Sequence, residues 1–242
     1  MIQIFTKELN GFLNSLIGYT VVGFFLVAVG LLMWVFPETS VLDYGFAEME
    51  TLFSLGPFVF IFLVPAITMR SFAEERKMGT LEWLLTKPLK EGSLVLGKFF
   101  ASWCLVCLSL LPTILYYVTL VQLGSPQGNI DTSGVIGSYL GLILLGAIFC
   151  CLGIFASTLV TNQIVSFILG AFLCYIFYSG FESASMLFQE GATVLFIKQV
   201  GMVYHYESLG RGLIDSRDVV YFLGLGGIFL LSAKTVLSSR SW

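Results

Sequence analysis

Long apolar blocks without charged residues, separated by short polar segments, make up most of this chain. The blocks show neither the alternation of a half-buried strand nor the 3.6-residue period of a half-buried helix. A helix needs about 20 apolar residues to cross a hydrocarbon core about 30 Å thick. The pattern therefore predicts an all-α membrane protein with six transmembrane helices in a single domain, residues 1–242. The expected spans are residues 16–36, 51–69, 99–123, 135–160, 164–180 and 219–237.

The longest apolar stretch, residues 132–181, contains no charged residue and is too long for one span. The polar triplet at residues 161–163 divides it into the fourth and fifth spans. Pro57 and Pro65 in the second span and Pro112 in the third remove backbone donors and predict local bends. Such bends suit a bundle that changes shape and, equally, a bundle that is static.

Residues 2–14 predict an amphipathic helix that lies in the membrane interface ahead of the first span. Six apolar residues fall within one arc at 100° per residue, with Ile4 outside it; a frayed tail is the alternative. The uncharged block from Asn10 to Phe36 exceeds the roughly 7–15 apolar residues of a signal peptide, so the first span is expected to be retained. The arc consists of Ile2, Phe5, Leu9, Phe12, Leu13 and Leu16.

Composition agrees with a membrane protein. The chain is 57% hydrophobic and 11% charged, whereas a soluble domain carries about 25% charged residues, and its mean hydropathy is +0.92. With the N-terminus in the cytoplasm, nine Lys and Arg residues fall in cytoplasmic segments and three in outer ones. This asymmetry predicts a multi-pass protein of the cell inner (cytoplasmic) membrane with both termini cytoplasmic. The lipid bilayer is thus its first partner, and no nucleic acid is expected.

Residues 92–98 (GSLVLGK) match the G-x-x-x-x-G-K pattern of a phosphate-binding loop. Such a loop needs a preceding strand and a following Ser or Thr that binds magnesium. Phe99 follows instead, and Lys98 directly precedes a span, so Lys98 is interpreted as an interfacial anchor. The chain is therefore expected to lack an ATPase site of its own and not to be an enzyme.

The sequence predicts no cofactor and no metal site. Glu182, at the outer end of the fifth span, is interpreted as a solvated or interfacial carboxylate rather than a substrate or ion ligand. His205, in the last outer segment, has no convergent ligand motif and is interpreted as interfacial packing. Cys104 and Cys107 form a C-x-x-C inside a span without a second ligand pair, so packing is the favoured role. A membrane enzyme or an ion channel is accordingly disfavoured.

Small residues in the fourth span predict close helix packing, because they let helix backbones approach one another. Gly137 and Gly141 form a G-x-x-x-G on one face. Gly146 and Gly153 belong to a stripe on the opposite face, nearer the cytoplasm.

The cytoplasmic loop expected at residues 70–98 contains half of all Lys and Arg residues. A short helix within it, ended by Pro88, has an apolar stripe with Trp83 standing off that stripe. Such a helix either lies on the membrane surface or inserts into the groove of a partner. An external motor would need this loop, since no other cytoplasmic element has adequate size.

Two segments carry a resemblance to ABC-2-type permeases, the membrane subunits of ABC transporters whose ATPase is a separate chain. Residues 72–88 (FAEERKMGTLEWLLTKP) resemble the family's E-x-x-x-G-T-x-E-x-L-L-x-x-P segment. Residues 210–222 (GRGLIDSRDVVYF) are similar to the G-x-I-D-x-R-D-x-x-Y-F segment that leads into the last span. More narrowly, the chain is similar to the gliding-motility-associated permeases of Bacteroidetes.

The resemblance implies a type V exporter-like fold in which two six-span subunits pair and a cytoplasmic ABC ATPase docks below. The second permease subunit would make a homodimer or a heterodimer. The family also implies a coupling helix near residues 80–86 and a re-entrant-type helix within the outer segment, residues 182–218. A structural membrane scaffold that does not transport is the alternative function. The residues implied in ATPase coupling are Glu75, Gly79, Thr80, Leu81, Glu82 and Trp83.

Overall fold

The structure of the chain, a computed structural model, describes residues 1–80, 91–188, 191–212 and 215–239. Every regular element within these residues is a helix. Five helical segments in the described part are long and apolar enough to cross a membrane, and the bent pair α1–α2 brings the number to six if it counts as one span. The prediction of an all-α membrane protein is therefore confirmed.

The helices differ widely in length, from single turns to α9 with 28 residues. In chain order they are α1 (Ile2–Leu13), α2 (Leu16–Trp34), α3 (Val41–Tyr44), α4 (Glu50–Thr68), α5 (Arg70–Lys77), α7 (Glu91–Leu110), the 3-10 turn η1 (Leu111–Thr113), α8 (Ile114–Leu123), α9 (Thr132–Leu159), α10 (Gln163–Tyr175), the π-helical turn η2 (Ile176–Gly180), α11 (Phe181–Ser185), α12 (Ala192–Val200), α13 (Met202–Gly210) and α14 (Ser216–Ser238).

Polar side chains cap the long helices at the points where the chain turns back. Asp131 accepts a hydrogen bond from the backbone N–H of Gly134 and begins α9. Asn162 caps α10 in the same way, and Asp215 caps α14. These side chains satisfy donors that a helix leaves free at its start. The polar triplet, residues 161–163, thus follows the end of α9 and reaches the first residue of α10, and its Asn162 caps α10.

The α9 helix lies at the centre of the bundle and packs against α4, α5, α7, α10, α13 and α14. The most apolar stretch of α9 is 72% buried within the chain, whereas that of α14 is 17% buried. Most of the α14 surface is therefore left for lipid or another subunit, while α9 is surrounded by protein.

Glycines of α9 lie where neighbouring helices come close. A Cβ atom on Gly137 would lie 2.2 Å from the backbone oxygen of Leu209 in α13. A Cβ atom on Gly153 would lie 2.0 Å from the Thr68 hydroxyl oxygen in α4. Residues larger than glycine would push these helices apart. Gly141 and Gly146 make less close approaches, with a Cβ atom 3.0 Å from the Tyr206 ring of α13 and 2.8 Å from the Val106 side chain of α7, respectively.

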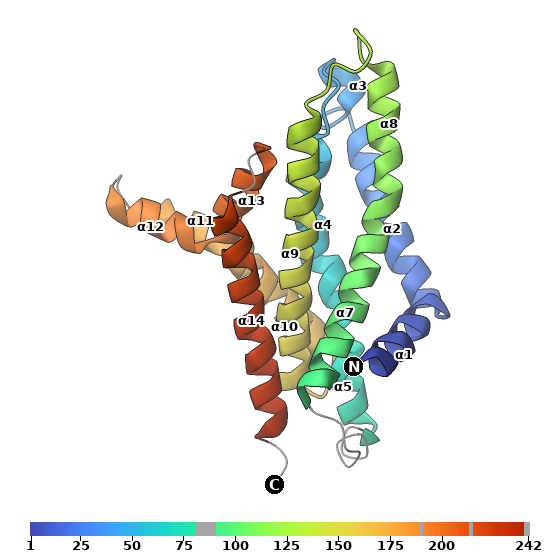
Figure 1. The fold of residues 1–242 in the computed structure, drawn as a ribbon, viewed down its shortest axis with the longest axis vertical. Coiled ribbons are helices and arrows are strands. Elements are labelled where there is room, and N and C mark those ends of the chain that lie inside the picture. Colours follow the sequence, from blue (N-terminus) through green and yellow to red (C-terminus); the bar gives the residue numbers. More distant parts are fainter. Residues whose placement is uncertain (81–90, 189–190, 213–214, 240–242) are drawn as a thin grey trace.

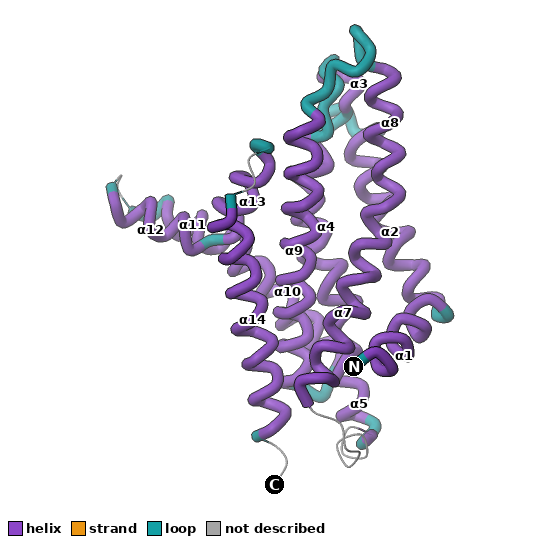
Figure 2. The backbone as a smooth tube through the Cα atoms, in the orientation of Figure 1, coloured by secondary structure: helices purple, strands orange, loops and turns teal. Residues whose placement is uncertain are grey.

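The two ends of the bundle differ (Figure 1). The end that we call the terminal end carries α1, α5 and the carboxyl end of α14. The opposite end, called the α3 end, carries α3 and the turn between α8 and α9. Figure 2 shows that loops gather at the α3 end, and that α11 and α12 project sideways from the bundle. The α12 helix has no buried residue, and it lies within the segment where a re-entrant-type helix was predicted.

Helix replaces loop over much of residues 70–98. The α5 helix directly follows α4, so that one helical segment runs over Glu50–Lys77, and α7 already begins at Glu91. The physical reason is burial: Phe72 and Ala73 are fully buried, and α5 packs on α9 and α10. The expected loop is thereby shortened to a connection between α5 and α7, of which residues 81–90 lie outside the described residues.

The prolines act differently from one another. Pro112 lies in η1, between α7 and α8, where the helix changes its hydrogen-bonding pattern. Pro57 and Pro65 lie inside α4, which continues through both. The π-helical turn η2, which follows α10, was not predicted from the sequence, because no residue pattern marks such a turn. It inserts one extra residue into a helical turn and is frequent at functional sites.

Gly137→Ala is expected to destabilise the bundle, because the new Cβ would meet a backbone oxygen that no rotamer change can move. Overpacking costs about 1–3 kcal/mol, so the thermal unfolding midpoint of the purified chain should fall by several degrees. The matched control is Gly224→Ala in α14, where no atom lies within 4 Å. That variant should be as stable as the wild type or more so, since alanine is the better helix former. Equal stability of both variants would contradict the close α9–α13 contact.

Candidate functional site

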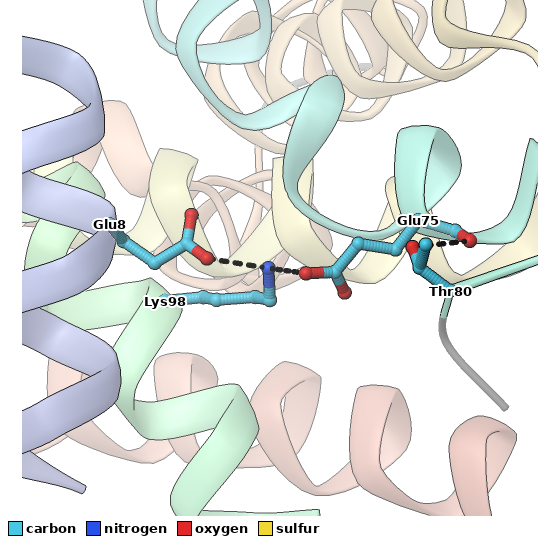
Figure 3. A network of polar contacts seen from close by, with 4 residues as sticks. All are labelled: Glu8, Glu75, Thr80 and Lys98. Atoms are coloured by element: carbon cyan, nitrogen blue, oxygen red, sulfur yellow. Dashed lines mark hydrogen bonds and ion pairs between the residues drawn. The ribbon is translucent and has the colours of Figure 1, made fainter. Parts of the chain in front are cut away.

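A buried lysine joins three helices at the terminal end (Figure 3). The Lys98 side chain of α7 is 2% exposed, and its Nζ donates to Glu8 Oε1 of α1 at 3.0 Å and to Glu75 Oε1 of α5 at 2.8 Å. The ammonium group also lies 5.1 Å from the ring centroid of Phe72. Lys98 is therefore more than the interfacial anchor predicted from the sequence, because it is the centre of an ion-pair network.

The network is held together because its members cannot separate without leaving a buried charge. A lysine in a low-dielectric environment keeps its charge only when carboxylates or other acceptors surround it. Glu8 and Glu75 supply these charges from α1 and α5, which are 90 and 23 residues away from Lys98 in sequence. The three helices are therefore tied together by charge in addition to apolar packing.

Gly97, next to Lys98, explains how α1 comes close enough for this contact. A Cβ atom on Gly97 would lie 2.8 Å from the Ile4 side chain of α1. Ile4, the apolar residue outside the predicted arc, thus faces α7 one helical turn from Glu8. Ile2 and Leu16 of the arc are strongly exposed, as expected for a surface in contact with lipid. Within α7, Gly97 and Lys98 of the G-x-x-x-x-G-K match therefore act in helix packing and charge pairing.

The chain turns away from α5 directly beside this network. Gly79 has φ +67°, a left-handed conformation that glycine adopts without strain and that commonly ends a helix. The Thr80 hydroxyl donates to the backbone oxygen of Glu75 at 3.2 Å. Three residues of the predicted coupling set, Glu75, Gly79 and Thr80, are thus close together. The other three, Leu81, Glu82 and Trp83, lie outside the described residues.

A large cavity opens at the other end of the bundle. It has a volume of about 1190 Å³ and lies among the first turns of α4, the start of α9, the η2–α11 region and α13. Met49, Phe53 and Tyr206 form part of its wall and belong to the hydrophobic core. The Tyr206 hydroxyl donates to the backbone oxygen of Phe53 at 2.7 Å, which fixes α13 against α4.

Carboxylates from five parts of the chain line the cavity. Asp131, the cap of α9, has a pKa held below its usual range by hydrogen bonds from the Ser133 hydroxyl and the Gly134 N–H. It is therefore ionised at neutral pH. Of the acids that line the cavity only Glu182 is singled out by the sequence, because nothing in the sequence brings the first loop, α11 and α13 together. The lining acids are Glu48, Glu50, Asp131, Glu182 and Glu207.

His205 pairs with an acid and does not face other metal ligands in the described residues. Its Nδ1 lies 2.7 Å from Asp218 Oδ1 of α14, and its Nε2 lies 2.9 Å from the backbone oxygen of Gln199. The ring also stacks on Tyr221, with 3.9 Å between the ring centroids. His205 thus joins α13 to α12 and α14. His205 therefore does more than pack at the interface, because it also contacts Asp218. The sequence does not indicate this contact, since the two residues lie on different helices.

The five cysteines are free, and Cys150, Cys151 and Cys174 are buried. Cys104 and Cys107, the C-x-x-C pair, are half-buried and form no disulfide. Within the described residues no group of three or more His, Cys, Asp and Glu side chains is placed to hold a metal ion.

The comparison with known families agrees with this architecture. The family described as ABC-2 family transporter protein matches residues 38–210. That range contains the second to fifth apolar segments, the α5–α7 connection, and the whole of the cavity lining. No curated protein matches the chain at a significant level.

Lys98→Met is expected to destabilise the terminal end, because it leaves Glu8 and Glu75 without their cation. Breaking a fully buried ion pair costs about 3–5 kcal/mol; partial solvent exposure of the two carboxylates should reduce this to about 1–3 kcal/mol. Combining Lys98→Met with Glu75→Gln should recover part of the loss. Thermal unfolding of the four members of this double-mutant cycle measures the coupling.

Lys77→Met is the matched control for that cycle, since it removes an exposed lysine of the neighbouring α5 helix. It should change the unfolding midpoint little. An additive cycle, in which the two substitutions do not influence each other, would show that the Lys98–Glu75 contact is energetically unimportant.

Proposed function

The chain belongs to the ABC-2 family of transporter proteins, and we propose that it couples ATP hydrolysis by a separate ATPase chain to transport across the inner membrane. Family membership makes it a membrane permease subunit and not itself an ATPase. It also implies an ABC ATPase as partner. The observation that carries the coupling proposal is the Lys98 network, which joins the start of the α5–α7 connection to α1 and α7.

A force applied at the α5–α7 connection would reach several helices through this arrangement. Glu75 belongs to α5, which continues the helical segment that begins at Glu50. The first turns of that segment, in α4, line the cavity at the α3 end. Lys98 passes the same displacement to α7, and Glu8 passes it to α1. We infer that Glu75, Gly79 and Thr80 form the described part of the coupling site. Leu81, Glu82 and Trp83 would contact the ATPase itself.

The proposed orientation places the terminal end in the cytoplasm. The excess of Lys and Arg in the segments assigned to that side supports it, and α1 and the carboxyl end of α14 lie at the same end (Figure 1). The α3 end and its acidic cavity would then face outwards. The finer proposal is that the complex contains a second permease subunit and serves gliding motility, which rests on the similarity of residues 72–88 and 210–222 to such permeases.

An ATPase subunit is expected to co-purify with the chain from native membranes. The double substitution Glu82→Ala/Trp83→Ala should abolish this association without changing the amount of folded permease, because aromatic anchors dominate groove-binding interfaces. Asp43→Asn, which changes an exposed acid outside the α5–α7 connection, is the matched control and should retain the ATPase. If no ATPase accompanies the intact chain, the coupling proposal is wrong.

Transport and scaffolding differ in whether the bundle moves. Spin labels at Phe62 of α4 and Phe172 of α10, which are both exposed, should report altered distances when ATP is added to the assembled complex. Alternation between two states requires such a change, because a conduit must open to each side in turn. Unchanged distance distributions during ATP hydrolysis would favour a static scaffold over a transporter.

A further inference from the structure

The cavity at the α3 end has a negative lining. Five carboxylates face it, and its lining contains no Lys or Arg among the described residues. The acids come from the first loop, the start of α4, the cap of α9, α11 and α13, so the charge surrounds the cavity instead of forming one patch. Charges of one sign in a cleft with low-dielectric walls concentrate ions of the opposite sign.

Tyr178 provides a separate sign that the cavity accepts a ligand. It belongs to the π-helical turn η2, lines the cavity and is 5% exposed. Its hydroxyl makes no hydrogen bond to the described part of the chain. Tyr206 beside it, in contrast, donates to Phe53. The Tyr178 hydroxyl is not among the fully buried polar atoms that lack a partner, so it reaches the open cavity and is available to a bound molecule.

Glu182 follows Tyr178 by about one helical turn, and both line the cavity. Glu207 lines it too and directly follows Tyr206, whose ring centroid lies 6.4 Å from that of Tyr178. A protonated amine between Glu182 and Glu207 would donate to the two carboxylates, and a further N–H of the amine would donate to the Tyr178 hydroxyl oxygen, which can accept it. Such charge-assisted hydrogen bonds are the strong ones in proteins.

An aromatic and apolar wall lies next to these charges. Phe58 meets Tyr178 edge to face, with ring centroids 5.6 Å apart, and Phe58 is 45% exposed. Aromatic faces attract cations and also bury apolar surface. The wall therefore suits a molecule whose charged group is attached to an apolar body.

A bare metal ion fits this site less well. Among the described residues no three carboxylates or other ligands are placed to share one ion. The volume of about 1190 Å³ slightly exceeds the roughly 300–1,000 Å³ typical of sites for drug-sized molecules. Both facts favour an organic cation over an inorganic one.

We propose that this cavity binds an organic cation with a protonated amine and an apolar body, the amine lying among Glu182, Glu207 and Tyr178. As a substrate site it rests on the proposed transport function. Binding itself requires no ATP, so it can be measured whether or not an ATPase is present.

The test measures the binding of rhodamine 6G, a lipophilic cation whose charged ring system carries two ethylamino N–H donors, to the full chain in lipid nanodiscs by fluorescence anisotropy. Empty nanodiscs provide the blank for partition into lipid. Rhodamine B is similar in size but has a free carboxylate in place of the ester and lacks the amine N–H groups, so it tests the requirement for net positive charge together with N–H donors. Saturable binding is expected for rhodamine 6G, with at least tenfold weaker binding of rhodamine B.

Substitutions locate the binding. The double variant Glu182→Gln/Glu207→Gln should raise the Kd for rhodamine 6G at least tenfold, and Tyr178→Phe should raise it severalfold. Asp43→Asn removes an outer acid that does not line the cavity and should leave the Kd unchanged. The charge-retaining variant Glu182→Asp/Glu207→Asp should bind within severalfold of the wild type, and equal unfolding midpoints exclude a folding defect.

Three results would overturn the proposal: no saturable binding of rhodamine 6G to the wild type, equal affinity for rhodamine B, or an unchanged Kd in the double glutamine variant. Failure of the transport proposal would look different. In that case no ATPase would co-purify, while the cation would still bind and the substitutions would still weaken it.

Discussion

Close approach to α9 is the constraint on which the rest of this bundle depends. In a membrane, apolar side chains gain little by leaving lipid for protein, so helices associate mainly through tight packing and polar contacts. Gly137 and Gly153 let α13 and α4 touch the α9 backbone at positions where even a methyl group would not fit. The cavity depends on the same contacts, because α4, α9 and α13 are among the elements that enclose it.

Charge is distributed so that the two ends of the bundle have different chemistry. At the terminal end, two carboxylates are neutralised in part by one buried lysine, and the result is a rigid connection among α1, α5 and α7. At the α3 end, five carboxylates surround open space without a cation in the described lining. In the Lys98 network the charges pair with one another, whereas the carboxylates around the cavity can interact with a bound molecule. Connection and binding are thereby separated along a single helical segment, α4–α5, which reaches both.

The apolar segments were predictable because the bilayer imposes a length and a composition that can be read from consecutive residues. Asn162 is an example, since one polar triplet in a long apolar stretch had to be a break.

The burial of Lys98 was not predicted, because its partners lie far away in sequence and a lysine at a span boundary usually reaches water. The cavity was missed for a related reason: Glu182, Glu207 and Asp131 become neighbours only through tertiary packing, and the π-helical turn carrying Tyr178 has no sequence pattern. Burial of Phe72, which extends the helix past Arg70, likewise depends on α9 being present.

The contact between α1 and α7 also has a consequence for biosynthesis. A ribosome completes Glu8 and Ile4 about 90 residues before Gly97 and Lys98 exist. During that interval α1 has no partner helix, and Glu8 has no counter-ion from its own chain. The predicted interfacial helix would therefore remain at the membrane surface, with its carboxylate in water, until the third apolar segment enters the bilayer. Once Lys98 has been synthesised, its contact with Glu8 holds α1 against α7. Docking of α1 would therefore follow the synthesis of the third of the six expected spans.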